Sequence, residues 1–273
     1  MPHEAAPLAA PRGTGDKPRM FEIADQLALL LILAAFSAGL VDSIAGGGGL
    51  ITVPALLLAG ASPVEALATN KLQGTFGAAT AMVTYARAGH VRPMDQLGMA
   101  AISALAGAGG ALVAHLIPIE VLRVIMPVVL IGVALFFALK PGLTDDARTA
   151  RISPPVFAVT VVPLVAAYDG FFGPGTGSFY MMGFVLLAGY GVLKATAHTK
   201  MLNFASNLGS LLVFLPFGAT WWAVGLAMAA AQVAGASLGA RLAIRVGAGL
   251  IKPLLVVVST GMAMRLLWQA LAG

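Results

Sequence analysis

The chain has 273 residues, of which 59% are hydrophobic and only 10% charged, with a mean hydropathy of +0.92. Soluble domains carry about 25% charged residues, and no polar block here is large enough to form one. The composition therefore excludes a soluble globular protein and indicates an integral membrane protein. Long, predominantly apolar runs, such as 121–139, favour membrane helices over short alternating strands.

The chain has a formal charge of +5 and no cysteine, and both facts limit the sites and partners that it can have. Without cysteine, disulfides and thiolate metal sites are excluded. Lys and Arg gather in the cytoplasmic loops of membrane proteins, so we expect no nucleic acid partner. Neither the GxxxxGK[ST] pattern of ATP hydrolysis nor the HExxH pattern of metalloproteases occurs. We therefore expect neither a cofactor nor a bound metal.

In chain order, the sequence predicts a disordered tail at 1–26 without a signal peptide, and then a first membrane repeat at 27–139. A cytoplasmic linker is predicted at 140–155 and a second membrane repeat at 156–273. The apolar segments of the two repeats are 27–45, 50–59, 66–86, 96–117, 121–139, 156–170, 177–189, 196–215, 221–244 and 250–270.

The two halves repeat the same order of residues. "DSIAGGGGLITVPALLLAG" (42–60) aligns with "DGFFGPGTGSFYMMGFVLLAG" (169–189), since each has an Asp, a glycine-rich run and an apolar stretch that ends in Leu-Leu-Ala-Gly. Without a further gap, "ATNK" (68–71) then aligns with "AHTK" (197–200), and "AGAGGA" (106–111) with "AGASLG" (234–239). We interpret this order as an internal repeat.

Basic residues indicate how the halves are oriented. If each glycine-broken pair of segments enters and leaves the membrane on one side, all four basic loops lie on the same side, as the positive-inside rule requires. If each broken pair crossed once, the loop near 245 would lie outside. We therefore predict an all-α polytopic protein with two inverted repeats. Each repeat has one re-entrant broken segment and about three full spans, for about eight transmembrane segments in all. The basic loop residues are Arg87, Arg92, Lys140, Arg148, Arg151, Lys194, Arg241, Arg245 and Lys252.

A glycine-rich break interrupts one apolar segment in each half. Irregular backbone at membrane depth occurs only where it is buried in protein or lines a wet cavity, and matching breaks in two halves point to the binding site of a secondary transporter. Helices that start near Leu50 and Ser178 would aim free N–H groups and partial positive charge at one central anion. The predicted break residues are Gly46, Gly47, Gly48, Gly49, Gly173, Gly175, Thr176 and Gly177.

Glycines also permit close helix packing in lipid, which is the alternative explanation of these breaks. We favour packing for Gly235 and Gly239, which are spaced as GxxxG.

Charged side chains within membrane spans usually mark function or an ion pair. Each lysine either extends to the membrane surface or faces the cavity, where it contacts the anion or neutralises an Asp. The aspartates, together with His198, are candidates for proton coupling or for shaping the site. The four charged residues are Asp42, Lys71, Asp169 and Lys200.

Neutral polar side chains near the lysines share helix faces and could donate hydrogen bonds to an oxyanion. Asn70 and Gln73 are three residues apart, and Thr199, Asn203 and Asn207 step by four.

At these motifs the sequence resembles the TauE/SafE family of membrane permeases, the sulfite exporter family. The resemblance covers nearly all of the chain after the tail and rests on the two glycine-rich stretches followed by "ATNKLQGT" and "AHTKMLNFASNLGS". It implies two homologous halves of about four spans each and movement of small anions, including sulfite and organosulfonates. Pro174 and Thr176 interrupt the second glycine run, so this half departs from the pattern of the first.

The sequence thus predicts a secondary transporter of small anions, an exporter by resemblance, in the cell (inner) membrane. Two alternatives stay open. One is an intramembrane hydrolase that uses Ser178 and His198, and the other is a non-transporting subunit of a membrane complex. The expected partners are a small anion and the lipid bilayer, with a homodimer as an open alternative for the assembly.

Overall fold

The computed structural model describes residues 25–122, 124–125, 128–129, 132, 149–247 and 249. The predicted tail lies outside the described residues except for 25–26, which begin the first helix. Residues 140–148 of the predicted linker, most of the predicted segment 121–139 and all of the segment 250–270 also lie outside them.

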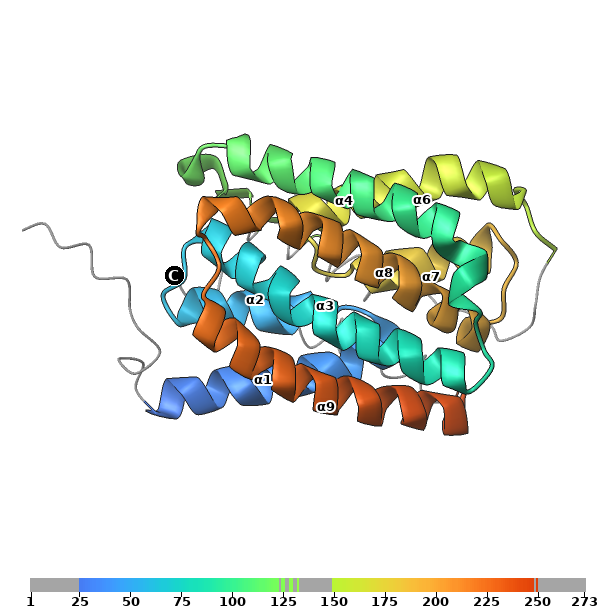
Figure 1. Cartoon of the computed structure of the whole chain (residues 1–273), viewed down its shortest axis with the longest axis horizontal. Helices are drawn as coiled ribbons and strands as arrows, with labels where there is room; N and C mark the ends of the chain where they lie inside the picture. The colour runs from blue at the N-terminus through green and yellow to red at the C-terminus, as the bar shows by residue number, and fades with distance from the viewer. Residues whose placement is uncertain are drawn as a thin grey trace, which may run out of the picture.

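The described elements are helices, and their order is the same in both halves (Figure 1). A long helix is followed by a short one and then by two long ones. The first half contains α1 (Asp25–Ala45), α2 (Gly49–Leu58), α3 (Pro63–Arg87) and α4 (Leu97–Leu116). The second half contains α6 (Pro154–Phe171), α7 (Thr176–Leu186), α8 (Val192–Phe214) and α9 (Trp222–Val246). The 3₁₀ turns η2 (Pro93–Gln96) and η3 (Leu215–Phe217) precede α4 and follow α8.

Local sequence explains where α3 and α6 begin. At the start of α3, the Ser62 hydroxyl accepts the Glu65 N–H while the Glu65 carboxylate accepts the Ser62 N–H, which is a capping box. Pro63 follows at the first helical position, where its fixed φ suits a helix and its missing N–H costs nothing. Pro154 takes the same role in α6 after Ser153. These starts lie within a few residues of the predicted segments.

The long helices form two groups, each of which runs in one direction. In Figure 1, α3 and α9 run from left to right, whereas α4 and α8 run from right to left. The first helix of each half packs against the last helix of the other half, since α1 lies along α9 and α6 lies along α4. The two halves are therefore interleaved rather than side by side.

Small residues set the closest of these contacts. A Cβ on Gly235 or Gly239 of α9 would collide with the backbone of Phe36 or Leu40 in α1. The prediction that these two glycines serve helix packing is confirmed. On the opposite side of the molecule, Gly110 of α4 meets the backbone of α6 in the same way.

Four of the described helical segments are long and apolar enough to cross a membrane, and they end at Ala45, Leu116, Phe171 and Val246. Their outer faces carry exposed Leu and Val side chains, which suits contact with lipid. The two remaining long helices, α3 and α8, lie in the interior, where they contact each other. They carry most of the buried polar residues in the part of the chain that the structure describes.

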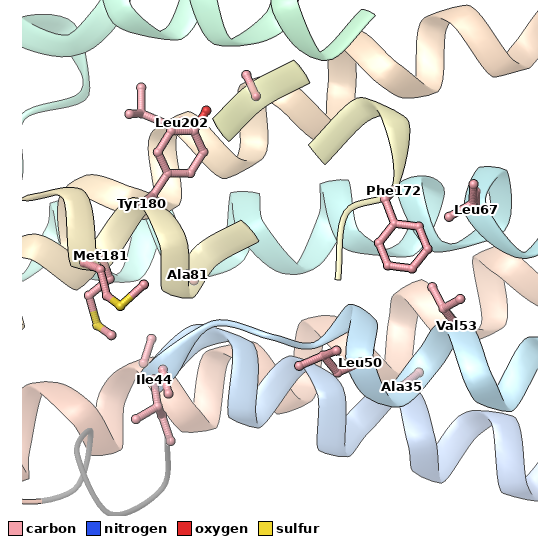
Figure 2. Close-up of a cluster of buried hydrophobic side chains, with 14 of the residues drawn as sticks. Ala35, Ile44, Leu50, Val53, Leu67, Ala81, Phe172, Tyr180, Met181 and Leu202 are labelled. Atoms are coloured by element: carbon pink, nitrogen blue, oxygen red, sulfur yellow. The ribbon is translucent and has the colours of Figure 1, made fainter. Parts of the chain in front are cut away.

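The hydrophobic core surrounds the two short helices. Figure 2 shows side chains from both halves within one cluster, among them Leu50 and Val53 of α2, Phe172 and Tyr180. The Tyr180 hydroxyl is buried with its partner, the Ser103 hydroxyl, at 2.9 Å, so this aromatic side chain leaves no polar atom unpaired. The core thereby holds the short helices and the breaks before them in fixed positions.

Candidate substrate site at two helix breaks

The glycine-rich runs end helices inside the bundle, as predicted. In the first half α1 stops at Ala45 and α2 starts at Gly49, and between them Gly46 and Gly47 have φ of +81° and +96°. In the second half Gly173 and Gly175 have φ of +95° and +87° before α7 starts at Thr176. Only glycine adopts these left-handed angles without strain, which is why both breaks need it.

The two breaks contact each other at the centre of the molecule. Gly46 lies so close to the backbone of Gly177 and Ser178 that even one added methyl group would overlap with them. The Ser178 hydroxyl donates a hydrogen bond of 2.8 Å to the carbonyl oxygen of Ala45, at the end of α1. Ala45 and Ser178 lie 133 positions apart in the chain, so distant segments build a single centre.

Lys71 of α3 forms an ion pair with Asp169 of α6, in the other half of the chain. The ammonium nitrogen lies 2.7 Å from Asp169 Oδ1 and also donates to the Asp169 carbonyl oxygen. The Asp169 carboxylate accepts three further hydrogen bonds, from Thr176 Oγ1 at 3.0 Å, from Asn207 Nδ2 at 3.3 Å and from the Ser206 hydroxyl. Both partners are buried, with 0% and 2% of their side chains exposed.

Lys200 of α8 pairs with Asp42 of α1 in the reciprocal arrangement, although less tightly. The ammonium nitrogen donates to the Asp42 carbonyl oxygen and lies 3.5 Å from Asp42 Oδ2. Asp42 Oδ1 accepts the backbone N–H of Gly48 at 3.2 Å, so this carboxylate also holds the break before α2 in shape. Its side chain is 13% exposed, which is more than that of Asp169.

The lysines therefore do not extend to the membrane surface. Each is buried and bound to the aspartate of the opposite half, so two positive and two negative charges cancel within the bundle. Leaving one of these charges unpaired in the interior would cost several kcal/mol, about 3–5 by analogy with broken buried pairs. The two ion pairs thus connect the ends of α1 and α6, which precede the breaks, to α8 and α3.

A small polar pocket opens where the breaks meet. Its volume is about 20 Å³, which is room for about one water molecule. The pocket is lined by the starts of both short helices and by side chains from α1, α3, α6, α8 and α9. The lining residues are Asp42, Gly47, Gly48, Gly49, Asn70, Gly74, Asp169, Gly173, Gly175, Thr176, Gly177, Asn203, Asn207 and Gln232.

Hydrogen bonds orient the amide groups of two asparagines in the pocket. Asn70 Oδ1 accepts from the Thr52 hydroxyl at 2.6 Å and from Gln73 Nε2 at 3.3 Å. Asn203 Oδ1 accepts from Asn207 Nδ2 at 3.1 Å. Because both oxygens are engaged, each of the two asparagines has its NH₂ group left to donate into the pocket.

Not every residue of the predicted site lines this pocket. Gly46 lies in the contact between the breaks. Lys71 and Lys200 form ion pairs with the carboxylates of Asp169 and Asp42 and do not line the pocket themselves. Gln73 supports Asn70, and the Thr199 hydroxyl donates to the carbonyl oxygen of Ala195 in its own helix at 2.8 Å.

His198 faces another part of the molecule. Its Nδ1 lies 2.8 Å from Gln96 Nε2, and its ring packs against Tyr190 and Phe184. In the described residues no hydrogen bond joins His198 to Ser178, whose hydroxyl is engaged with Ala45. The pair on which a hydrolase would depend is therefore not assembled.

Two lining residues, Gly74 and Gln232, were not predicted from the sequence. Gln232 is the more informative because it is 5% exposed and its Oε1 has no hydrogen-bond partner among the described residues. A lone amide in the apolar run 221–244 was the available signal. Its meaning depends on α9 lying beside α1 and α3, where Gln232 packs against Gly39 and Gly77.

Comparison with known proteins gives the chain its family. A family model described as "Sulfite exporter TauE/SafE" matches residues 31–266. No solved structure matches the chain.

The relatives of the chain carry transporter names. The "Probable membrane transporter protein ORF9" of a Sinorhizobium species is 56% identical over 91% of this chain and 95% of its own. The Escherichia coli K12 "Probable membrane transporter protein YfcA" is 43% identical over 92% and 93%, and a "Probable membrane transporter protein" of Haemophilus influenzae is 39% identical over 91% and 97%. These names indicate a transporter rather than an enzyme. The chain belongs to the sulfite exporter TauE/SafE family, and it is a multi-pass transporter protein of the inner membrane.

Proposed function

We propose that the protein is a secondary transporter that exports small anions such as sulfite or organosulfonates, and that it binds them between the two broken helices near the membrane midplane. The observation that carries the proposal is the pocket in which both breaks meet. The starts of α2 and α7 border this pocket together. Each helix start contributes partial positive charge, equivalent to about half an elementary charge.

Charge balance supports an anion as the ligand. The two carboxylates that border the pocket would repel an anion if they stood alone, but each is paired with a lysine. The remaining fixed charge is that of the helix starts, and the remaining donors are the amides of Asn70, Asn203 and Gln232. Neutral donors and helix starts can hold an oxyanion without a dedicated cation. While both aspartates are ionised, the lysines pair with them rather than contacting the anion.

We further propose that the halves are inverted repeats with about eight membrane segments, including the two re-entrant ones. The interleaved packing supports this proposal, since α3 and α8 occupy matching places in their halves and run in opposite directions (Figure 1). The pocket has room for about one water in this form, so an organosulfonate requires a more open state. Movement of the group α1, α3 and α9 against the group α4, α6 and α8, whose members contact one another, would supply alternating access.

Asp42 is the best candidate for proton coupling. It borders the pocket, is more exposed than Asp169, and lies at 3.5 Å rather than 2.7 Å from its lysine. Protonation of Asp42 would leave the ammonium group of Lys200 without its counter-charge, so a proton and an anion would bind together. Asp169 is held by four side-chain hydrogen-bond donors and suits a structural role.

Anion flux in proteoliposomes tests the proposal, with sulfite and sulfoacetate as the first substrates. We expect concentration-dependent, saturable flux in the wild type. Asn70→Leu and Asn203→Leu should lower flux by about 10-fold or more each, because each loses one donor worth about 1.5 kcal/mol to a charged ligand. Thr80→Val serves as a matched control, since the Thr80 hydroxyl donates to the carbonyl oxygen of Phe76 in its own helix and does not line the pocket. Wild-type flux in both asparagine variants would overturn the site assignment.

A further inference from the structure

A second cavity lies at the far end of α3 and α9, away from the helix breaks. It has a volume of about 330 Å³, within the range of roughly 300–1,000 Å³ that is typical of small-molecule sites. Three arginines line it, Arg87 from the last turn of α3 and Arg241 and Arg245 from the last turns of α9. The other lining residues are Thr84, Ala88 and Ile244.

No carboxylate neutralises these arginines within the described parts of the chain. The ion pairs there are Lys71–Asp169 and Lys200–Asp42, both in the central site. Arg241 and Arg245 are four residues apart and so share one face of α9, while Arg87 approaches from α3. Three guanidinium groups around one open cavity make a site for a group with at least two negatively charged or strongly accepting oxygens, such as a phosphate.

The surroundings favour a phosphate that belongs to a lipid. Val83 on α3 and Leu242 and Val246 on α9 are exposed apolar side chains, and each directly precedes or follows a lining residue in the sequence. The candidate span that contains α9 ends at Val246, so the arginines lie at the level where the apolar segment ends. A lipid phosphate would reach the arginines while its acyl chains lie against the apolar side chains. The positive-inside rule places this end of the bundle at the cytoplasmic surface.

The geometry points to a binding site for the phosphate head group of an anionic phospholipid, formed by Arg87, Arg241 and Arg245 between the ends of α3 and α9. Both helices also border the central pocket, through Asn70 and Gln232. A lipid bound at this position would hold α3 and α9 together at their cytoplasmic ends. It would therefore stabilise the group of helices that carries two of the pocket amides.

Lipid titration of the purified full-length protein tests this site. Thermal unfolding is followed in a neutral detergent with added phosphatidylglycerol, with added phosphatidylcholine, or with inorganic phosphate alone. We expect phosphatidylglycerol to raise the unfolding temperature of the wild type more than the other two additives do. In the variant Arg241→Gln/Arg245→Gln the apparent affinity should fall by about 25-fold, at roughly fivefold for each arginine removed near a membrane surface.

Arg92→Gln is the matched control, since Arg92 is exposed in the loop that follows α3 and does not line the cavity. It should bind phosphatidylglycerol as the wild type does. Equal loss of affinity in this control would overturn the site, because the effect would then be one of net charge. Equal stabilisation by inorganic phosphate would overturn the lipid assignment. A large destabilisation of the double variant in phosphatidylcholine alone would also overturn it, since the arginines would then serve the fold itself.

Discussion

Lys71 and Asp169 lie 98 positions apart in the chain, yet they form a buried ion pair with 2.7 Å between Nζ and Oδ1. The pair joins α3 of the first half to the end of α6 in the second half, just before the second break in the chain. Because both side chains are buried, each partner depends on the other for its compensating charge. The same cross-connection is repeated, more loosely, between Lys200 and Asp42.

A double-mutant cycle on the tighter pair should therefore show strong coupling. We expect Lys71→Met or Asp169→Asn alone to destabilise the fold by about 3–5 kcal/mol, since one buried charge is left unpaired. The double variant should lose less than the sum of the two. Thermal unfolding in detergent measures this, and a parallel cycle on Lys200 and Asp42 should give the smaller coupling. Additive losses for Lys71 and Asp169 would contradict the pairing.

The contact between the breaks should tolerate nothing larger than glycine at Gly46. The methyl group of Gly46→Ala would overlap with backbone atoms of Gly177 and Ser178. Alanine would also be strained at the φ of +81°. We expect loss of transport and of most folded protein. Gly60→Ala is the control, because Gly60 has φ of +92° but no atom within 4 Å of an added Cβ. Its cost should be limited to about 1–2 kcal/mol of backbone strain. Equal yields of folded protein for both variants would refute the tight contact.

Gln232 should affect transport more than another buried glutamine of the same kind does. Gln232→Leu removes an amide whose Oε1 is unpaired and which borders the pocket, so we expect lower anion flux with the fold retained. Gln96→Leu is the comparison, since Gln96 is also buried with an unpaired Oε1 but contacts His198 instead of the pocket. Initial rates in proteoliposomes, normalised to folded protein, measure the difference. If the flux through Gln96→Leu were the lower of the two, the pocket would not be the route.

Proton coupling through Asp42 has a defined sign. Acidifying the side that holds the anion should raise the initial rate of flux from that side, because protonated Asp42 leaves Lys200 without its counter-charge. Asp42→Asn fixes this residue in a neutral state, so its rate should be nearly independent of pH. His198→Gln should keep the wild-type pH dependence, since His198 contacts Gln96 and Tyr190 rather than the pocket. The opposite pattern in these two variants would assign the coupling to His198.

Two adjacent glycines in α4 should respond in opposite ways to the same substitution. An added methyl on Gly110 would collide with the carbonyl oxygen of Ala167 in α6, whereas one on Gly109 meets nothing within 4 Å. We expect Gly110→Ala to destabilise the protein by about 1–3 kcal/mol. Gly109→Ala should be neutral or stabilising by up to about 1 kcal/mol, because alanine favours the helix. The unfolding temperatures of the two variants decide the matter, and a similar shift in both would mean that α4 and α6 are not closely packed.

Most of the helices could be predicted from the sequence, because hydropathy and chain punctuation are local. The predicted segments 27–45, 50–59 and 156–170 match α1, α2 and α6 to within two residues. The breaks were also predictable, since runs of glycine inside apolar segments destabilise a helix and favour its end. The family followed from the same motifs, and the comparisons confirm it.

What the sequence by itself determined is thus the membrane class, the matching order of motifs in the two halves and the residues that bear charge inside them. Only the tertiary structure decided the partners of those residues. The repeat aligns Lys71 with Lys200 and Asp42 with Asp169, but it does not say whether a lysine pairs within its own half or across to the other. Contacts between α1 and α9 and between α4 and α6 interleave the halves, so each lysine meets the aspartate of the opposite half. The same interleaving brings Gln232 to the pocket, because a residue's place in the bundle depends on packing between helices that are distant in the chain.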